Sequence, residues 1–182
     1  DSFSSDKNVG TERYMATVAY SGNGILGGQD LYVQLATRGE KLGFYPFPGN
    51  VTLQSGKIPY MSSSQQDTYY SGIKALLSKS WRGLNVTYGA DFDFEKFEGT
   101  QSVYDIAKTM SSGGLINETK YSLGRYPTNH SQSYAGYVQA KYNILPKLQL
   151  NAGIRYQHIN VKMDDFVGSE QQTQIAMGYG NS

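Results

Sequence analysis

The sequence predicts an all-β fold, a segment of an antiparallel transmembrane β-barrel with long extracellular loops. Six stretches alternate apolar and polar residues at the two-residue period of a strand, and none carries a sustained helical repeat. The connections between these stretches are alternately short and long, which is typical of outer-membrane barrels with short periplasmic turns. Tyrosines recur at strand ends, as in the aromatic belts at membrane interfaces.

The composition agrees with one domain of two-faced strands. The 182 residues include 16 tyrosines and 21 glycines, and the formal net charge is only +1, which gives no argument for nucleic-acid binding. Charged residues make up 17% of the chain, below the roughly 25% of ordinary soluble domains. Cysteine is absent, so disulfides and cysteine-based metal sites are excluded.

The first three predicted strands are Thr11–Tyr20, Gln29–Arg38 and Asp67–Lys79. In the first, one face carries Tyr14, Ala16, Val18 and Tyr20. In the second, the apolar face carries Leu31, Val33 and Leu35, and the other face carries Tyr32, Gln34, Ala36 and Arg38. In the third, the two faces carry Tyr69, Ile73, Ala75 and Leu77 against Thr68, Tyr70, Lys74 and Ser78.

The next three predicted strands are Leu84–Phe97, Ser133–Ile144 and Leu148–Met163. The fourth has the clearest alternation, with Leu84, Val86, Tyr88, Ala90, Phe92 and Phe94 against Asn85, Thr87, Gly89, Asp91, Asp93 and Glu95. In the fifth, one face carries Tyr134, Val138, Ala140 and Tyr142. In the sixth, the apolar face carries Leu148, Leu150, Ala152, Ile154 and Tyr156. We expect the apolar faces to meet lipid and the polar faces a watery interior.

Two shorter features complete the predicted elements. A weaker seventh strand is predicted at Gln174–Tyr179, where Ile175, Met177 and Tyr179 share a face. One or two helical turns are predicted at Tyr104–Met110, inside a connection of about 35 residues between the fourth and fifth strands. Another long loop, of about 28 residues, is predicted between the second and third strands.

Several stretches resemble the barrel of TonB-dependent outer-membrane siderophore receptors. The pattern Y..Y.Q..Y.....L.L..GIRY is common in that family, and it is carried here by Tyr134, Tyr137, Gln139, Tyr142, Leu148, Leu150, Gly153, Ile154, Arg155 and Tyr156. The stretches GGL…KY.LGRYP and FYPF resemble receptors of the ferric aerobactin type. The resemblance implies a receptor and transporter of the bacterial outer membrane that takes up a ferric siderophore.

The resemblance also implies a larger parent protein. Members of the family have about 22 strands around a plugged lumen, so residues 1–182 are expected to be part of the barrel domain, without the plug domain or the C-terminal strands. The implied partners are the ferric siderophore, the receptor's own plug, inner-membrane TonB and outer-membrane lipid. No cofactor is implied, because iron arrives within the siderophore chelate, and no nucleic acid is implied.

The resemblance places ligand contacts on the extracellular loops. In LGFYPFPGN, the candidates are Phe44, Tyr45 and Phe47, whose aromatic rings could meet apolar parts of a siderophore. Arg38, Lys41, Arg125 and Tyr126 are candidates because cationic groups form charge-assisted hydrogen bonds with carboxylates. Packing among neighbouring loops, or simple solvation, is the alternative for each of these residues.

The remaining polar residues indicate no chemistry of their own. Arg155 and Lys74 are expected to pair with Asp91 or Asp93 on the polar faces, or to contact a plug. No arrangement of Ser, His and acidic residues is typical of an enzyme, and we predict no catalytic or metal-binding residue. A small porin or adhesin barrel and a soluble β-barrel that binds an apolar ligand remain alternatives, since alternation by itself fits both.

Overall fold

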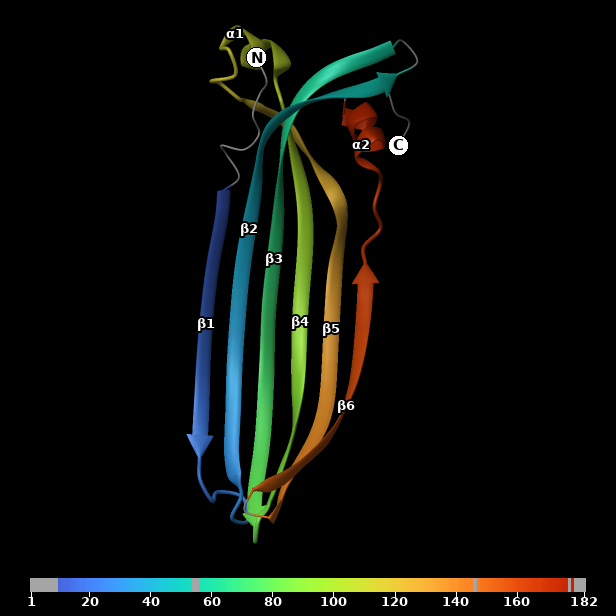
Figure 1. Ribbon diagram of the computed structural model, residues 1–182. Coiled ribbons are helices and arrows are strands. Elements are labelled where there is room, and N and C mark those ends of the chain that lie inside the picture. Colours follow the sequence, from blue (N-terminus) through green and yellow to red (C-terminus); the bar gives the residue numbers. More distant parts are fainter. Residues whose placement is uncertain (1–9, 54–55, 146, 177, 179–182) are drawn as a thin grey trace.

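A computed structural model describes residues 10–53, 56–145, 147–176 and 178. One antiparallel sheet dominates the chain, with its strands in sequence order (Figure 1). The strands are β1 (Gly10–Gly22), β2 (Asp30–Leu53), β3 (Gly56–Trp81), β4 (Leu84–Tyr104), β5 (Thr119–Leu145) and β6 (Leu148–Met163). The six strongest predicted strands are therefore confirmed, and each pairs with its neighbours in the chain.

The sheet has two distinct ends (Figure 1). The turn end carries the connections from β1 to β2, from β3 to β4 and from β5 to β6. The helix end carries the outer halves of β2–β5 and two helices, α1 (Ile106–Ser111) and α2 (Ser169–Ala176). The short predicted connections thus gather at one end, as expected for consecutive hairpins.

The two long connections were predicted as loops, and this is wrong over most of their length. β2 and β3 stay paired up to Leu53 and Gly56, with a register shift between Phe44 and Phe47. β4 and β5 likewise stay paired up to Tyr104 and Thr119, with several shifts. Backbone hydrogen bonds hold a ladder together whether or not one face is apolar. The extensions can therefore pair as strands without the alternation of apolar and polar residues that predicts a strand from the sequence.

Helix α1 confirms the predicted helical turns near Tyr104–Met110. Asp105 is the N-cap, and its Oδ1 accepts hydrogen bonds from the backbone N–H groups of Ala107 (3.0 Å) and Lys108 (3.2 Å). A side chain in this position satisfies donors that have no partner within the helix. Lys108 also pairs with Glu118, which joins the helix to the start of β5.

The predicted seventh strand is wrong where the structure describes it, because Gln174–Ala176 belong to α2. Residues 177 and 179–182 lie outside the described residues. Three alternating apolar residues are too few to separate a strand from a helix. Side-chain contacts decide the outcome: Gln172 bonds the backbone of Gly124 in β5, and Gln174 bonds that of Thr52 in β2.

The sheet encloses almost no apolar core. Among the described residues, the buried apolar side chains are those of Met61, Val103 and Ala135. One layer of sheet cannot bury either of its faces without a second layer or another solvent. The described helices include none that is long and apolar enough to cross a membrane.

Register defines the two faces, because residues directly opposite one another share a face. We call such a row across the strands a rung. The apolar face carries, from the turn end upward, the rung Leu77, Tyr88, Val138 and Ile154, then Val33, Ala75, Ala90 and Tyr156, then Val18, Leu35, Ile73, Phe92 and Tyr134. The polar face carries the intervening residues, including Arg38, Lys74, Asp91, Asp93 and Arg155.

Candidate functional site on the polar face

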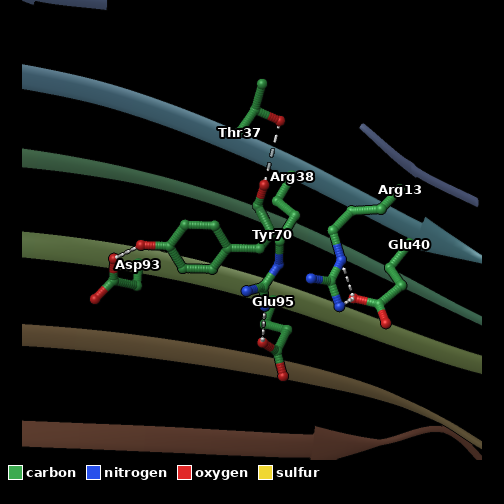
Figure 2. Close-up of polar contacts among 7 residues, drawn as sticks. All are labelled: Arg13, Thr37, Arg38, Glu40, Tyr70, Asp93 and Glu95. Carbon is green, nitrogen blue, oxygen red and sulfur yellow. Dashed lines mark hydrogen bonds and ion pairs between the residues drawn. The ribbon is translucent and has the colours of Figure 1, made fainter. Parts of the chain in front are cut away.

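Arg38 lies at the centre of a polar network on β2, β3 and β4 (Figure 2). Its guanidinium lies over the Tyr70 ring, 5.6 Å from the centroid. One Nη is 4.0 Å from Glu95 Oε2, and the Arg38 side chain is 43% exposed. The guanidinium has five N–H donors, and within the described part of the chain this long ion pair is its one contact with a carboxylate, which leaves most of the donors able to bind an anion.

Tyr70 connects this arginine to the next carboxylate. Its hydroxyl donates a hydrogen bond to Asp93 Oδ1. Gly72 makes room for this contact, because a Cβ there would lie 2.5 Å from both the Tyr70 hydroxyl oxygen and Asp93 Oδ1. From the opposite face, Thr37 Oγ1 donates to the Tyr70 backbone carbonyl at 3.2 Å. Tyr70 is thus held at both its ring and its backbone.

Arg13 and Glu40 form a separate pair at the β1–β2 edge of the network. Arg13 Nε donates to Glu40 Oε2 at 3.0 Å, and an Nη lies 2.9 Å from the same oxygen (Figure 2). This arginine is 61% exposed, and the two residues lie directly opposite one another in the register. Arg13 is therefore a second cation on the polar face, on the next rung of that face above the rung of Arg38.

A polar hollow of about 330 Å³ lies on the turn-end side of this network, lined in part by Gln34, Tyr70, Lys74, Asp91, Asp93 and Arg155. Arg155 donates two hydrogen bonds to Asp91, at 2.8 and 2.9 Å. This bidentate geometry confirms that Arg155 pairs with one of the two predicted aspartates. Lys74 instead lies over the Tyr137 ring, at 5.9 Å, and Arg155 lies over the same ring at 5.5 Å.

Three predicted site residues meet near the helix end, in the β2 and β5 extensions. Arg125 lies over the rings of Phe47 (5.4 Å) and Tyr126 (5.6 Å). Its guanidinium also donates to Ser64 Oγ and, at 3.2 Å, to the Tyr126 hydroxyl. The alternative of packing among neighbouring segments therefore holds for this arginine, and it has fewer unused donors than Arg38.

Lys41 and Phe44 lie outside these clusters in the described part of the structure. Lys41 is exposed and lies on the apolar-face side of β2, because it is an odd number of residues from Arg38 in an unbroken stretch of register. The structure therefore places these two candidate cations on opposite faces of β2. Phe44 lies in β2, at the register shift, and not in a loop. The Tyr45 side chain lies outside the described residues.

Sequence reasoning missed Tyr70, Glu95 and Gln172 as organising residues. The parity of each strand indicated that Tyr70 and Glu95 face the polar side, but only the register between strands places them on one rung with Arg38. Gln172 gave no signal, because its role depends on the packing of α2 against β5. Among the described residues, no group of three His, Cys, Asp or Glu side chains could hold a metal ion.

Comparison with known proteins gives one family and several relatives. The family described as TonB dependent receptor-like, beta-barrel matches residues 1–181. The chain is 43% identical over 180 residues to the ferric aerobactin receptor of Klebsiella pneumoniae and 41% identical to that of Escherichia coli. It is 38% identical over 181 residues to the rhizobactin receptor of Rhizobium meliloti (strain 1021).

These matches cover nearly the whole chain but only part of each relative. The two ferric aerobactin receptors match 98% of the chain and the rhizobactin receptor 99%, yet the chain spans 24% of the length of each. No solved structure matches the chain. The family match extends over both the polar network and the helix-end extensions. This chain belongs to the TonB-dependent receptor β-barrel family.

Proposed function

We propose that this chain forms part of the wall of an outer-membrane barrel that takes up a ferric siderophore with energy from TonB. The observation that carries the proposal is the continuous apolar face. On β4 it runs from Leu84 to Phe94, which is about 34 Å along the strand. At a barrel tilt of about 40° this spans about 26 Å, close to the apolar band of about 25 Å in outer-membrane barrels.

The orientation follows from the two ends of the sheet. The turn end fits the periplasmic side, where barrels have short turns, and the helix end fits the exterior. The polar face then lines the bore, where the plug expected for this family would contact the Arg155–Asp91 pair. Iron would enter as part of the chelate, so no protein side chain is needed to bind the metal directly.

Within this barrel wall, Arg38 is the strongest candidate for ligand contact. It lies on the polar face, above the hollow, and few of its donors are used by the residues that the structure describes. The printed names of the relatives are those of receptors for ferric aerobactin and rhizobactin. An anionic chelate would gain charge-assisted hydrogen bonds from this guanidinium. Arg125, with Phe47 and Tyr126, would present a cation and two rings further outward.

The test uses the intact receptor that contains this chain, with binding and uptake of ferric aerobactin as measurements. Arg38→Gln removes a charged donor, and we expect affinity to fall by about 10- to 150-fold, since hydrogen bonds to charged groups contribute about 1.5–3 kcal/mol. Lys41→Gln is the matched control, because it removes the same charge three residues away on the opposite face. Equal affinity of both variants and the wild type would refute the assignment of Arg38.

A further inference from the structure

The upper half of β6 reverses its amphipathic pattern. Below Tyr156 the apolar face of the strand carries aliphatic and aromatic residues, but above it that face carries His158, Asn160 and Lys162. The residues between them, Ile159, Val161 and Met163, turn to the polar face and are 50–68% exposed. Pairing with β5 is unshifted from Asn129 to Asn143, so the reversal lies in the sequence and not in a bulge.

Neighbouring strands extend these side chains into a contiguous polar patch. We define the patch by Lys96 of β4, His130 and Gln132 of β5, and His158, Asn160 and Lys162 of β6. His158 occupies the same rung as Val18, Leu35, Ile73, Phe92 and Tyr134. The patch therefore reaches down to a height at which β1–β5 are apolar, and a hydrocarbon layer that covers those strands would meet polar groups on β6.

The charges of the patch are only partly compensated. Lys96 pairs with Glu98, and His130 Nε2 lies 3.7 Å from Asp164 Oδ2. Among the described residues, Lys162 makes no ion pair within 4.0 Å. Lys96, His130 and Lys162 are directly opposite one another on three neighbouring strands. The backbones of the two lysines are therefore about 10 Å apart, which is two strand spacings. This spacing suits a phosphate held between two ammonium groups.

An apolar hollow begins one rung below His158. Its volume is about 390 Å³, and it lies over the small side chains of Ala75 and Ala90, with Phe92, Tyr134 and Tyr156 among the residues around it. The His158 ring stacks on the Tyr134 ring at 4.9 Å, so the patch and the hollow share a wall. An occupant that fits both must have a hydrocarbon part and an anionic end.

We propose that the polar patch binds the phosphate headgroup of an anionic lipid of the outer leaflet, with a hydrocarbon chain of that lipid in the hollow below. Charge complementarity with Lys96 and Lys162, and continuity of the hollow with the apolar face, select this occupant. The inference rests on the proposed function only in that the apolar face must meet a bilayer. It assigns no role to these residues in siderophore binding.

The experiment measures which lipid remains with the purified intact receptor. The receptor in neutral detergent is incubated with equal amounts of dioleoyl phosphatidic acid and dioleoyl phosphatidylcholine, repurified, and its lipid quantified by mass spectrometry. We expect enrichment of phosphatidic acid that falls about thirty-fold in the double variant K96Q/K162Q, since each of the two lysines near an anionic surface contributes about 1 kcal/mol. The control K57Q/K120Q removes two exposed lysines outside the patch and should keep the enrichment.

Ala90→Leu fills the hollow and should lower retention of both lipids. Equal retention of both lipids by the wild type, or equal loss in K57Q/K120Q, would overturn the proposal. A change of oligomeric state in K96Q/K162Q without a change in lipid would overturn it in favour of a protein partner. Ferric aerobactin binding is measured on the same samples, so a receptor that shows the lipid preference but no siderophore binding contradicts the proposed function alone.

Discussion

Gly89 offers the sharpest test of how closely the strands pack. A Cβ at this position would lie 2.2 Å from the Ala75 carbonyl oxygen and 3.0 Å from Leu76 Cδ2. Ordinary van der Waals contacts of a Cβ lie at 3.4–4 Å, so Gly89→Ala must separate the β3 and β4 backbones by more than 1 Å. Glycine within a strand often marks such an approach of another backbone.

The expected effect is a loss of about 2 kcal/mol or more in the free energy of unfolding. Overpacking alone typically costs about 1–3 kcal/mol, and lengthened ladder hydrogen bonds, each contributing about 1 kcal/mol, add to it. Gly136→Ala is the matched control, because the nearest atom to its Cβ would be the Gly89 carbonyl oxygen at 4.0 Å. That variant should be neutral or slightly stabilising, since glycine is unfavourable in strands.

Urea unfolding of the intact receptor in detergent micelles, followed by tryptophan fluorescence and by loss of heat-modifiable migration on gels, measures both variants. Equal midpoints for Gly89→Ala and Gly136→Ala would refute the reasoning. So would a destabilised Gly136→Ala variant beside an unchanged Gly89→Ala variant. Either result would mean that the close approach of the Ala75 carbonyl does not limit the size of the side chain at position 89.

Three further predictions concern pairs and caps. Asp91→Asn should lower the urea midpoint of the intact receptor, because it leaves Arg155 without its bidentate carboxylate. Asp105→Ala should destabilise helix α1 by about 1 kcal/mol through loss of its N-cap, measured by amide exchange. Hydrogen bonding to Glu118 raises the pKa of Lys108, so the pair stabilises α1 below the ordinary lysine pKa of about 10.4 and is lost as the pH rises through the higher folded value. Protease protection of α1 should fall there.

Each of these has a result that contradicts it. An Asp91→Asn variant as stable as the wild type would show that water or another group replaces the carboxylate. Unchanged exchange in Asp105→Ala would mean that packing, and not the cap, holds the helix. In a Glu118→Gln variant the pH dependence of protection should disappear, and its persistence would assign the titration to another group.

Both faces of the sheet are exposed over much of its length. Large side chains such as Ile154, Tyr156 and Val18 are 70–72% exposed on the apolar face, and the polar face holds a hollow lined by charges. Such a sheet gains its stability from what covers it. Measurements on the intact receptor in a membrane mimic are therefore the relevant ones.

The sequence by itself determined the existence of the six strands that the structure describes and the side on which each central residue points. Alternation is a local property, and a two-residue period is visible wherever one face meets an apolar medium. For this reason Asp91 and Arg155 were correctly expected on the polar side, and their contact follows from neighbouring strands. The sequence also indicated the family, through a pattern that includes Tyr134 and Arg155.

Only the tertiary structure decided the length of the strands, the grouping of residues on rungs and the helix at the end. Beyond Phe44 the extended ladder buries polar side chains such as Ser62 and Gln101 together with Val103, so pairing there leaves no apolar–polar period and the sequence predicts loops in place of long strands. The continuation of β2 past Arg38 placed Lys41 on the opposite face, and pairing with β5 put His158 on a rung that is apolar in β1–β5. Helix α2 depends on contacts of Gln172 with Gly124 of β5, which is far away in the sequence. Such a contact cannot be predicted from the periodicity of the residues around Gln172.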